Sequence, residues 1–183
     1  MKIEFDVKTL EISGFVGVFK ALRLPFGKEC RSECWWYGTQ GETQCTHHID
    51  EKDLKLLQTL VKRGDEHAKA IRGLIVYAEI NAPRYWWQEM DTYKVGTERL
   101  SSESTMHIQG RGMNTEELVA MKSELKEGTM QRRVQYFSYQ TLRRIYHQRK
   151  DHRLPHWHKF CAWIEKLPYA DILIIGREVC SEQ

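Results

Sequence analysis

Apolar residues recur along this chain with two different periods, which separate the expected strands from the expected helices. Residues 2–12 (KIEFDVKTLEI) alternate loosely and predict a strand that begins a sheet. Residues 74–80 (LIVYAEI) form the strongest apolar run, and the following Pro83 is expected to end this second strand.

Helical spacing dominates elsewhere. The first expected helix starts with Asp50 as its N-cap and ends at Gly64, and its apolar face consists of Leu54, Leu57, Leu60 and Val61. A second helix should start at Pro83 and run to about Val95. Further helices are predicted at residues 115–127, 138–151 and 155–166.

Few strands and several helices predict an α+β fold: a small mixed or antiparallel sheet with packed helices. The length of 183 residues is that of one domain, so we expect a single domain over residues 1–183. Residues 27–49 are rich in Gly, Cys and polar residues without a period, and we expect them to form a long Cys-rich loop.

The composition, 41% hydrophobic and 29% charged, is that of an ordinary soluble globular protein. No apolar run approaches the roughly 20 residues that a membrane span requires. The first residues, MKIEFD, do not resemble a signal peptide, because acids interrupt them at once. We therefore expect a cytoplasmic protein, in which an odd number of cysteines does not favour a disulfide framework.

The Cys-rich segment could alternatively hold a metal ion. Cys30, Cys34, Cys45 and His47 supply the thiolate and imidazole groups of a tetrahedral zinc site. Their spacings differ from those of known zinc ribbons and fingers. Free thiols are the favoured interpretation, and no metal is expected.

Familiar catalytic motifs are missing from the sequence. It contains no Gly-x-Ser-x-Gly, Gly-x-Gly-x-x-Gly, Walker loop or His-Glu-x-x-His. The chain therefore does not show the signature of a common hydrolase, kinase or dinucleotide-binding protein. Its most basic segment, from Arg132 to Arg153, holds six arginines against the single acid Asp151, which leaves a nucleic-acid-binding surface as one interpretation.

Residues 84–107 (RYWWQEMDTYKVGTERLSSESTMH) combine aromatic rings, carboxylates and hydroxyls with few aliphatic residues. Hydroxyls clustered at residues 101–105 would suit a phosphate or another oxygen-rich ligand. Flat aromatic rings would suit a nucleotide base. The competing interpretation is that Ser and Thr simply cap a helix. The residue chemistry favours a ligand site.

Three segments carry a resemblance to a known family: DEKDLKLLQTLVKRGDEHAK, APRYWWQEMDTYKVGTERLSSESTMH and YQTLRRIYHQRKDHRLPHWHKFCAWIEKLPY. Together they resemble the flavin-dependent thymidylate synthases, and most closely a divergent branch of short phage and prophage relatives. The family motif Q-x-x-R-H-R-x-x-S-x-N-x-x-S-x-R-Y, laid without gaps on this chain, is matched at Gln88 and, by its second serine, at Ser101. Its Arg-His-Arg core falls on residues 91–93 (DTY). A second family motif is matched in kind by Leu142, Arg149 and Trp157.

The resemblance implies an α+β protomer in a homotetramer, with sites where subunits meet. It also implies a reaction in which reduced FAD delivers a hydride to dUMP, methylenetetrahydrofolate supplies the carbon, and NADPH re-reduces the flavin. The implied substrate-binding residues are Arg149, Ser101, Ser102, Ser104, Gln88 and Arg143. Asp91 and Tyr93 are the implied catalytic groups, acting by acid–base chemistry or stacking, and Thr92, Tyr93 and His67 are the implied flavin contacts.

Three functional hypotheses follow. The first is a thymidylate synthase-like protein that binds a pyrimidine nucleotide of the dUMP type and methylates it with FAD. The second is a catalytically inactive protein that binds or sequesters a nucleotide on the same scaffold, because an acid and a phenol replace the two arginines of the family core. The third is a nucleic-acid binder that uses the arginines of residues 132–153.

Overall fold

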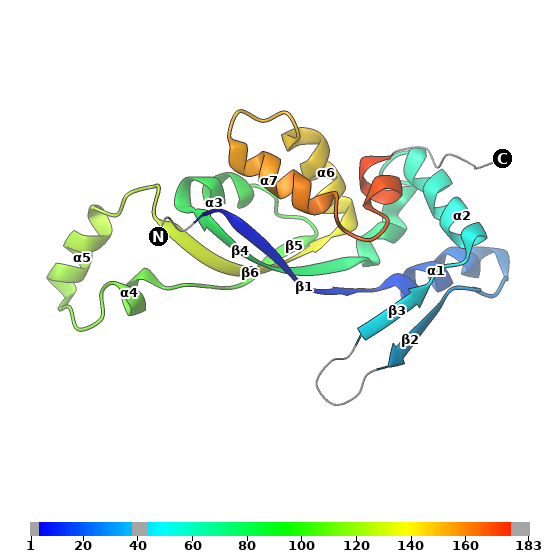
Figure 1. Ribbon diagram of the computed structural model, residues 1–183, viewed down its shortest axis with the longest axis horizontal. Helices are drawn as coiled ribbons and strands as arrows, with labels where there is room; N and C mark the ends of the chain where they lie inside the picture. The colour runs from blue at the N-terminus through cyan, green and yellow to red at the C-terminus, as the bar shows by residue number, and fades with distance from the viewer. Residues whose placement is uncertain (1–3, 38–43, 177–183) are drawn as a thin grey trace.

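The computed structural model describes residues 4–37 and 44–176 (Figure 1). An antiparallel four-stranded sheet in the order β1–β4–β6–β5 lies at its centre. Its strands are β1 (Asp6–Ser13), β4 (Ile75–Pro83), β5 (Thr97–Ser102) and β6 (Met130–Ser138). The expected α+β class and the two predicted strands are confirmed.

Three helices cover one face of this sheet (Figure 1). They are α3 (Arg84–Met90), α6 (Tyr139–Arg149) and α7 (Pro155–Ile164). Every second residue of β4 is buried beneath them, as a strand with one covered face requires. Trp86 and Trp157, both fully buried, pack with ring centres 4.8 Å apart and join α3 to α7.

A second group of elements lies at one end of the sheet (Figure 1). It contains α1 (Phe15–Arg23), α2 (Glu51–Lys62), the 3-10 turns η1 (Leu24–Phe26) and η2 (Ala68–Gly73), and the π-helical turn η3 (Asp171–Ile175). Residues 27–49 are not one long loop, because β2 (Glu33–Tyr37) and β3 (Gln44–His48) pair as an antiparallel hairpin. The hairpin was missed because Gly, Cys and polar residues hide the β-propensity of the Trp-Trp-Tyr run.

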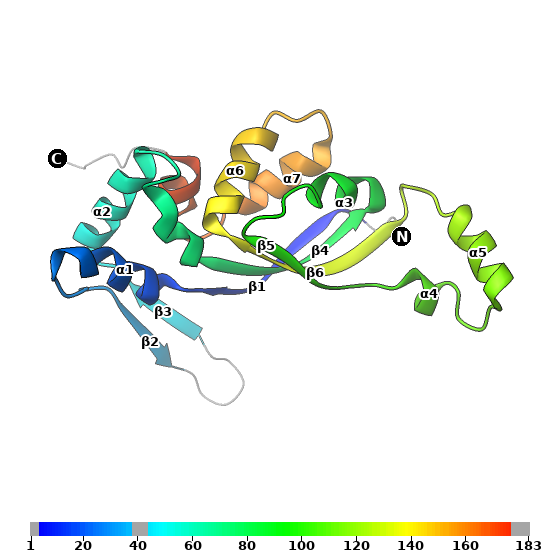
Figure 2. The same cartoon turned by 180° about the vertical axis from the view of Figure 1, so that it is seen from behind.

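At the opposite end, the chain between β5 and β6 extends beyond the sheet and carries α4 (Thr105–Ile108) and α5 (Thr115–Ser123) (Figure 2). Asn114 caps α5 in a reciprocal capping box with Glu117. Among the described residues, no helix combines the length and apolar character needed to cross a bilayer.

The helix expected from Pro83 to about Val95 is shorter than predicted, since α3 ends at Met90. The Thr92 hydroxyl donates to the carbonyl of Glu89 at 2.7 Å and so competes with continued helical bonding. Strands β5 and β6 were not predicted. In β6 the polar residues Arg133 and Gln135 lie on the buried face. The sequence therefore lacks the usual pattern of a half-buried strand, in which apolar residues face the core and polar residues face solvent.

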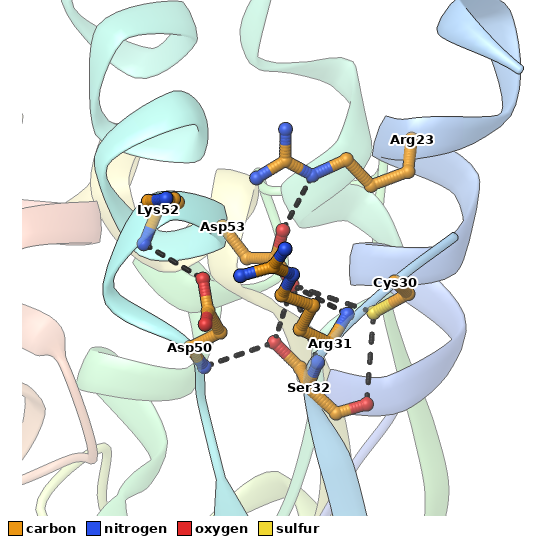
Figure 3. Close-up of polar contacts among 7 residues, drawn as sticks. All are labelled: Arg23, Cys30, Arg31, Ser32, Asp50, Lys52 and Asp53. Carbon is orange, nitrogen blue, oxygen red and sulfur yellow. Dashed lines mark hydrogen bonds and ion pairs between the residues drawn. The ribbon is translucent and has the colours of Figure 1, made fainter. Parts of the chain in front are cut away.

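The buried carboxylate of Asp53 joins α1, α2 and the segment before β2 (Figure 3). Its side chain is 1% exposed and accepts hydrogen bonds from Arg23 Nε and from Ser32 Oγ, the latter at 2.8 Å. The N–H groups of Arg31 and Ser32 and the Cys30 thiol also donate to it. Burial alone would raise the pKa of Asp53, but the bonds from Ser32, Arg23 and Cys30 outweigh burial and lower it.

We expect Asp53→Ala to lower the free energy of unfolding by about 3–5 kcal/mol, because it leaves the Arg23 cation without its partner. Glu51→Ala, in the exposed first turn of the same helix, should change it by less than about 1 kcal/mol. Urea unfolding monitored by circular dichroism measures both. Equal effects of the two substitutions would contradict this role of Asp53.

The lowered pKa of Asp53 sets the direction of a pH effect. The stabilisation by its carboxylate is complete above the pKa of the unfolded state and is lost as the pH falls through the folded-state pKa. The stability difference between the wild type and Asp53→Asn should therefore shrink between about pH 7 and about pH 3. A difference that stays constant over this range would contradict the assignment.

Candidate functional site

The turn between α3 and β5, residues 91–96, is fixed against the start of α6. Thr141 Oγ1 donates to the Val95 carbonyl and the N–H of Ser138 to the Gly96 carbonyl, both at 2.7 Å. Gly96 has a φ of +74°, and a Cβ there would lie 2.4 Å from Thr141 Oγ1. Glycine alone combines this backbone conformation with so close an approach. The position of the turn therefore depends on Gly96 and on its contacts with the start of α6.

Arg149, at the end of α6, lies behind this turn. Its Nε donates to the Tyr93 hydroxyl and its Nη1 to Glu89 Oε2, each at 2.8 Å. The guanidinium carbon lies 4.6 Å from the ring centre of Trp157. Within the described part of the chain, the Nη2 group has no recorded partner. Arg149 is thus held in one orientation and keeps donors for an anion.

Glu89 holds Arg149 in place. The same Oε2 atom accepts a bond from Trp157 Nε1 at 2.8 Å, and His152 Nε2 lies 3.5 Å away. One carboxylate of α3 therefore connects the last residue of α6 with the segment before α7 and with the first turn of α7.

A cavity of about 370 Å³, the cationic cavity, opens between the turn and α6. Its lining residues are Thr92, Tyr93, Lys94, Val95, Arg144, Gln148 and Arg149. Three of them carry a positive charge and none carries a carboxylate. This distribution suits a phosphate group, which accepts bonds from several cations at once.

A neighbouring cavity of about 350 Å³, the polar cavity, shares Tyr93 and Lys94 with the cationic cavity. Its other lining residues are Asp91, Thr97, Glu98, Arg99 and Gln135. Two cavities that adjoin along Tyr93 and Lys94 could hold the two ends of one ligand, an anionic group in one and an uncharged polar ring in the other.

Gln135 contributes an unusual group to the polar cavity. Its side chain is 3% exposed, and its Nε2 donates to Thr97 Oγ1 at 2.6 Å. Its buried Oε1 has no hydrogen-bond partner among the described residues. A buried polar atom without a partner costs about 1–3 kcal/mol, so it calls for a functional explanation. A donor group on a bound ligand would satisfy it.

Asp91 is paired with a buried cation. Arg133, 8% exposed, donates from Nη1 to the two carboxylate oxygens at 2.9 and 3.1 Å. The guanidinium also lies 4.2 Å from the ring centre of Trp87. Burial lowers the pKa of Arg133 while Asp91 opposes that change, so the carboxylate stabilises a buried charge.

The structure brings together four of the residues predicted for the site. Asp91, Tyr93, Thr92 and Arg149 all line one or both cavities. Their roles in catalysis and in ligand binding stay predictions. Hydrogen bonds within the chain already engage each of the four side chains.

The other predicted residues line neither cavity. Ser101 and Ser102 lie on β5, and Ser104 caps α4 by accepting a bond from the N–H of His107. The helix-cap interpretation therefore holds for Ser104.

Three more predicted residues lie elsewhere. Gln88 donates to Glu127 at 2.8 Å, and Arg143 donates to the carbonyl of Ile174 at 2.9 Å. His67 is exposed at the start of η2.

Three residues of the site region were not predicted from the sequence. Thr97 and Gln135, which line the polar cavity, lie on strands that were not predicted, and Glu89, which orients Arg149, was not singled out. The available signal was the alternation of polar and apolar residues at positions 133–136 (RVQY), which has the period of a strand.

The described residues contain no group of three or more His, Cys, Asp or Glu side chains suited to a metal ion. The side chains of Cys34, Cys45 and His47 lie outside the description, so the zinc alternative for the Cys-rich segment stays a prediction.

The fold is that of the flavin-dependent thymidylate synthases. A solved structure of this enzyme from Helicobacter pylori, complexed with FAD and dUMP, superposes with a TM-score of 0.66 at 14% identity, covering 92% of this chain and 97% of that chain. A second Helicobacter pylori structure with FAD and dUMP gives a TM-score of 0.65 at 14% identity, covering 96% and 100%. No protein-family model and no curated protein matches the sequence.

The residues at positions 91 and 93 do not fit the contacts with FAD that the resemblance implies. Asp91 is an acid neutralised by Arg133, so it offers no positive charge to a diphosphate. The Tyr93 hydroxyl donates to Gln148 and accepts from Arg149. These positions therefore present no unpaired cation to a flavin diphosphate.

We expect Gln135→Met/Thr97→Val to keep the free energy of unfolding of the unliganded protein within about 1 kcal/mol of wild type, or to raise it. The double substitution removes both polar partners and the unsatisfied oxygen together. Thermal and urea unfolding measure the effect.

The matched control is Ser138→Ala/Thr141→Val, which removes a buried pair whose bonds are all satisfied. It should cost about 1–3 kcal/mol. If the Gln135 variant loses as much stability as the control, Gln135 is a structural residue and its proposed role in the polar cavity is wrong.

Proposed function

We propose that this chain is a nucleotide-binding protein on the flavin-dependent thymidylate synthase fold, and that its ligand is a pyrimidine nucleotide of the dUMP type. The observation that carries the proposal is the cationic cavity, in which Lys94, Arg144 and Arg149 face a space without a carboxylate. The shared fold with proteins solved in complex with dUMP supports it.

The nucleotide phosphate would lie in the cationic cavity. Arg149 would donate from Nη2, since Nε and Nη1 are bonded to Tyr93 and Glu89. A preoriented guanidinium loses little side-chain entropy on binding, which favours affinity. The base would extend past Tyr93 into the polar cavity, where a ring N–H could reach Gln135.

Arg149→Gln should weaken dUMP binding by on the order of 10- to 100-fold, since a hydrogen bond to a charged group contributes about 1.5–3 kcal/mol. Arg153→Gln makes the same charge change at an exposed residue outside both cavities and should alter affinity by less than about twofold. Isothermal titration calorimetry at fixed ionic strength compares the two.

Equal losses of dUMP affinity in the two variants would show that the net charge of the protein, and not the position of Arg149, controls binding. An absence of dUMP binding by the wild-type protein would reject the proposal itself.

The second candidate is methylation of the nucleotide with FAD, methylenetetrahydrofolate and NADPH, which the shared fold supports. Asp91 and the occupied Tyr93 hydroxyl favour instead a protein that binds or sequesters a nucleotide without flavin chemistry. We propose the binding function as the primary one for this reason.

The isolated protein, after incubation with FAD and gel filtration, should show no flavin absorbance and no dUMP-dependent oxidation of NADPH. The physical reason is that Asp91 is neutralised by Arg133 and the Tyr93 hydroxyl is engaged by Gln148 and Arg149, so neither position offers a cation to the flavin diphosphate. An absorption spectrum and an NADPH assay test this expectation. A stoichiometric flavin spectrum together with dUMP-dependent turnover would establish the methylation candidate instead.

The nucleic-acid hypothesis receives less support from the geometry. Arg132 pairs with Glu103, Arg133 is buried against Asp91, and Arg143 is bonded to a backbone carbonyl. The arginines of residues 132–153 therefore do not form one solvated basic face of the kind that tracks a phosphate backbone.

A further inference from the structure

A third cavity lies among α1, α2 and the segment before β2. It has a volume of about 490 Å³ and is lined by Arg23, Lys28, Glu29, Cys30, Arg31 and Lys52. Four of these six residues are cations and one is an acid. The volume falls within the roughly 300–1,000 Å³ typical of small-molecule sites.

Three of the four cations are available to a ligand. Arg23 is paired with Asp53, but no ion pair involving Lys28, Arg31 or Lys52 is recorded within the described ranges 4–37 and 44–176. Lys52 is exposed, and only its backbone N–H is engaged, by the Asp50 side chain. Like charges gathered without partners repel one another, and a bound anion removes that repulsion.

The Asp53 network holds this segment in place before any ligand binds. The backbone N–H groups of Arg31 and Ser32 donate to Asp53 at 3.3 and 3.2 Å, and Ser32 Oγ accepts from the N–H of Asp50 at 3.2 Å. Figure 3 shows Arg23 of α1 and the segment Cys30, Arg31 and Ser32 converging on Asp53 of α2. Arg31 and Lys52 are therefore brought to one cavity by fixed backbone.

The acidic groups around the cavity have other partners or positions. Asp53 is buried beneath it and bonded to Arg23, and Asp50 caps α2. Glu51 lies in the exposed first turn of α2 and is not among the lining residues. Glu29 alone lines the cavity as a carboxylate. Positive charge therefore predominates at the cavity surface.

We propose that this cavity is a second anion site, which binds the phosphate group of a small phosphorylated molecule or of a phospholipid headgroup. Lys28, Arg31 and Lys52 are its ligand contacts. The site consists of α1, α2 and the segment between them, whereas the cationic cavity consists of the turn after α3 and α6. It is independent of the proposed nucleotide function.

Cys30 provides a local probe, because its partly buried thiol lines the cavity. Inorganic pyrophosphate should slow the alkylation of Cys30 by iodoacetamide several-fold or more. Peptide mass spectrometry measures the rate of alkylation. Potassium chloride at equal ionic strength serves as the blank. Arg149→Gln should leave this protection unchanged, because Arg149 belongs to the other cavity.

The decisive variant is Lys28→Gln/Arg31→Gln/Lys52→Gln, which should weaken pyrophosphate binding by on the order of tenfold or more. Lys8→Gln/Lys69→Gln/Arg153→Gln removes the same charges at exposed positions outside the cavity and should retain protection. Circular dichroism confirms that both variants are folded.

The same protection experiment with vesicles containing phosphatidic acid distinguishes a phospholipid headgroup from a soluble phosphorylated molecule. Protection of Cys30 by pyrophosphate supports a soluble ligand, and protection by vesicles alone supports a headgroup. The proposal is overturned if neither protects Cys30, or if the two triple variants lose protection equally.

Discussion

The bond between Glu89 and Arg149 is the interaction on which the candidate site depends. It connects α3 to the end of α6, and the same carboxylate accepts a bond from Trp157 of α7. Without this carboxylate, the guanidinium would lie against Trp157 and Tyr93 without a charged partner. With it, Arg149 is oriented at the wall of the cationic cavity and retains donors for a ligand. This partly buried ion pair orients Arg149 more than it stabilises the fold.

The electrostatics of the neighbouring turn are the reason that we propose nucleotide binding without flavin chemistry. Asp91 stands where the family core has an arginine, and it pairs with the buried Arg133 of the central sheet. The turn therefore offers a neutralised acid to the polar cavity, while Lys94, Arg144 and Arg149 keep the adjoining cavity positive. Under the proposed function, the positive cavity would bind the phosphate, and the turn would offer no cation at residues 91 and 93 to a flavin diphosphate.

Local signals were sufficient to predict much of the fold. The Asp50 cap, Gly64 and the leucine spacing placed α2, and the apolar run at residues 74–80 placed β4. Strand β6 was missed because Arg133 and Gln135 occupy its buried face, which reverses the usual pattern, and β5 depends on pairing with β6. Arg149 and Tyr93 were singled out through the resemblance, and both line the cationic cavity, while their roles stay predictions. Glu89, Thr97 and Gln135 could not be found, because their roles arise from contacts between distant segments.

A crystal structure of the protein grown with dUMP tests the central claim most directly. The account predicts electron density for the phosphate in the cationic cavity, within hydrogen-bond distance of Arg149 Nη2, with the Glu89–Arg149 bond intact and the base toward Gln135. A nucleotide bound elsewhere, or a phosphate that reaches Arg149 only after the Glu89 bond breaks, would contradict it.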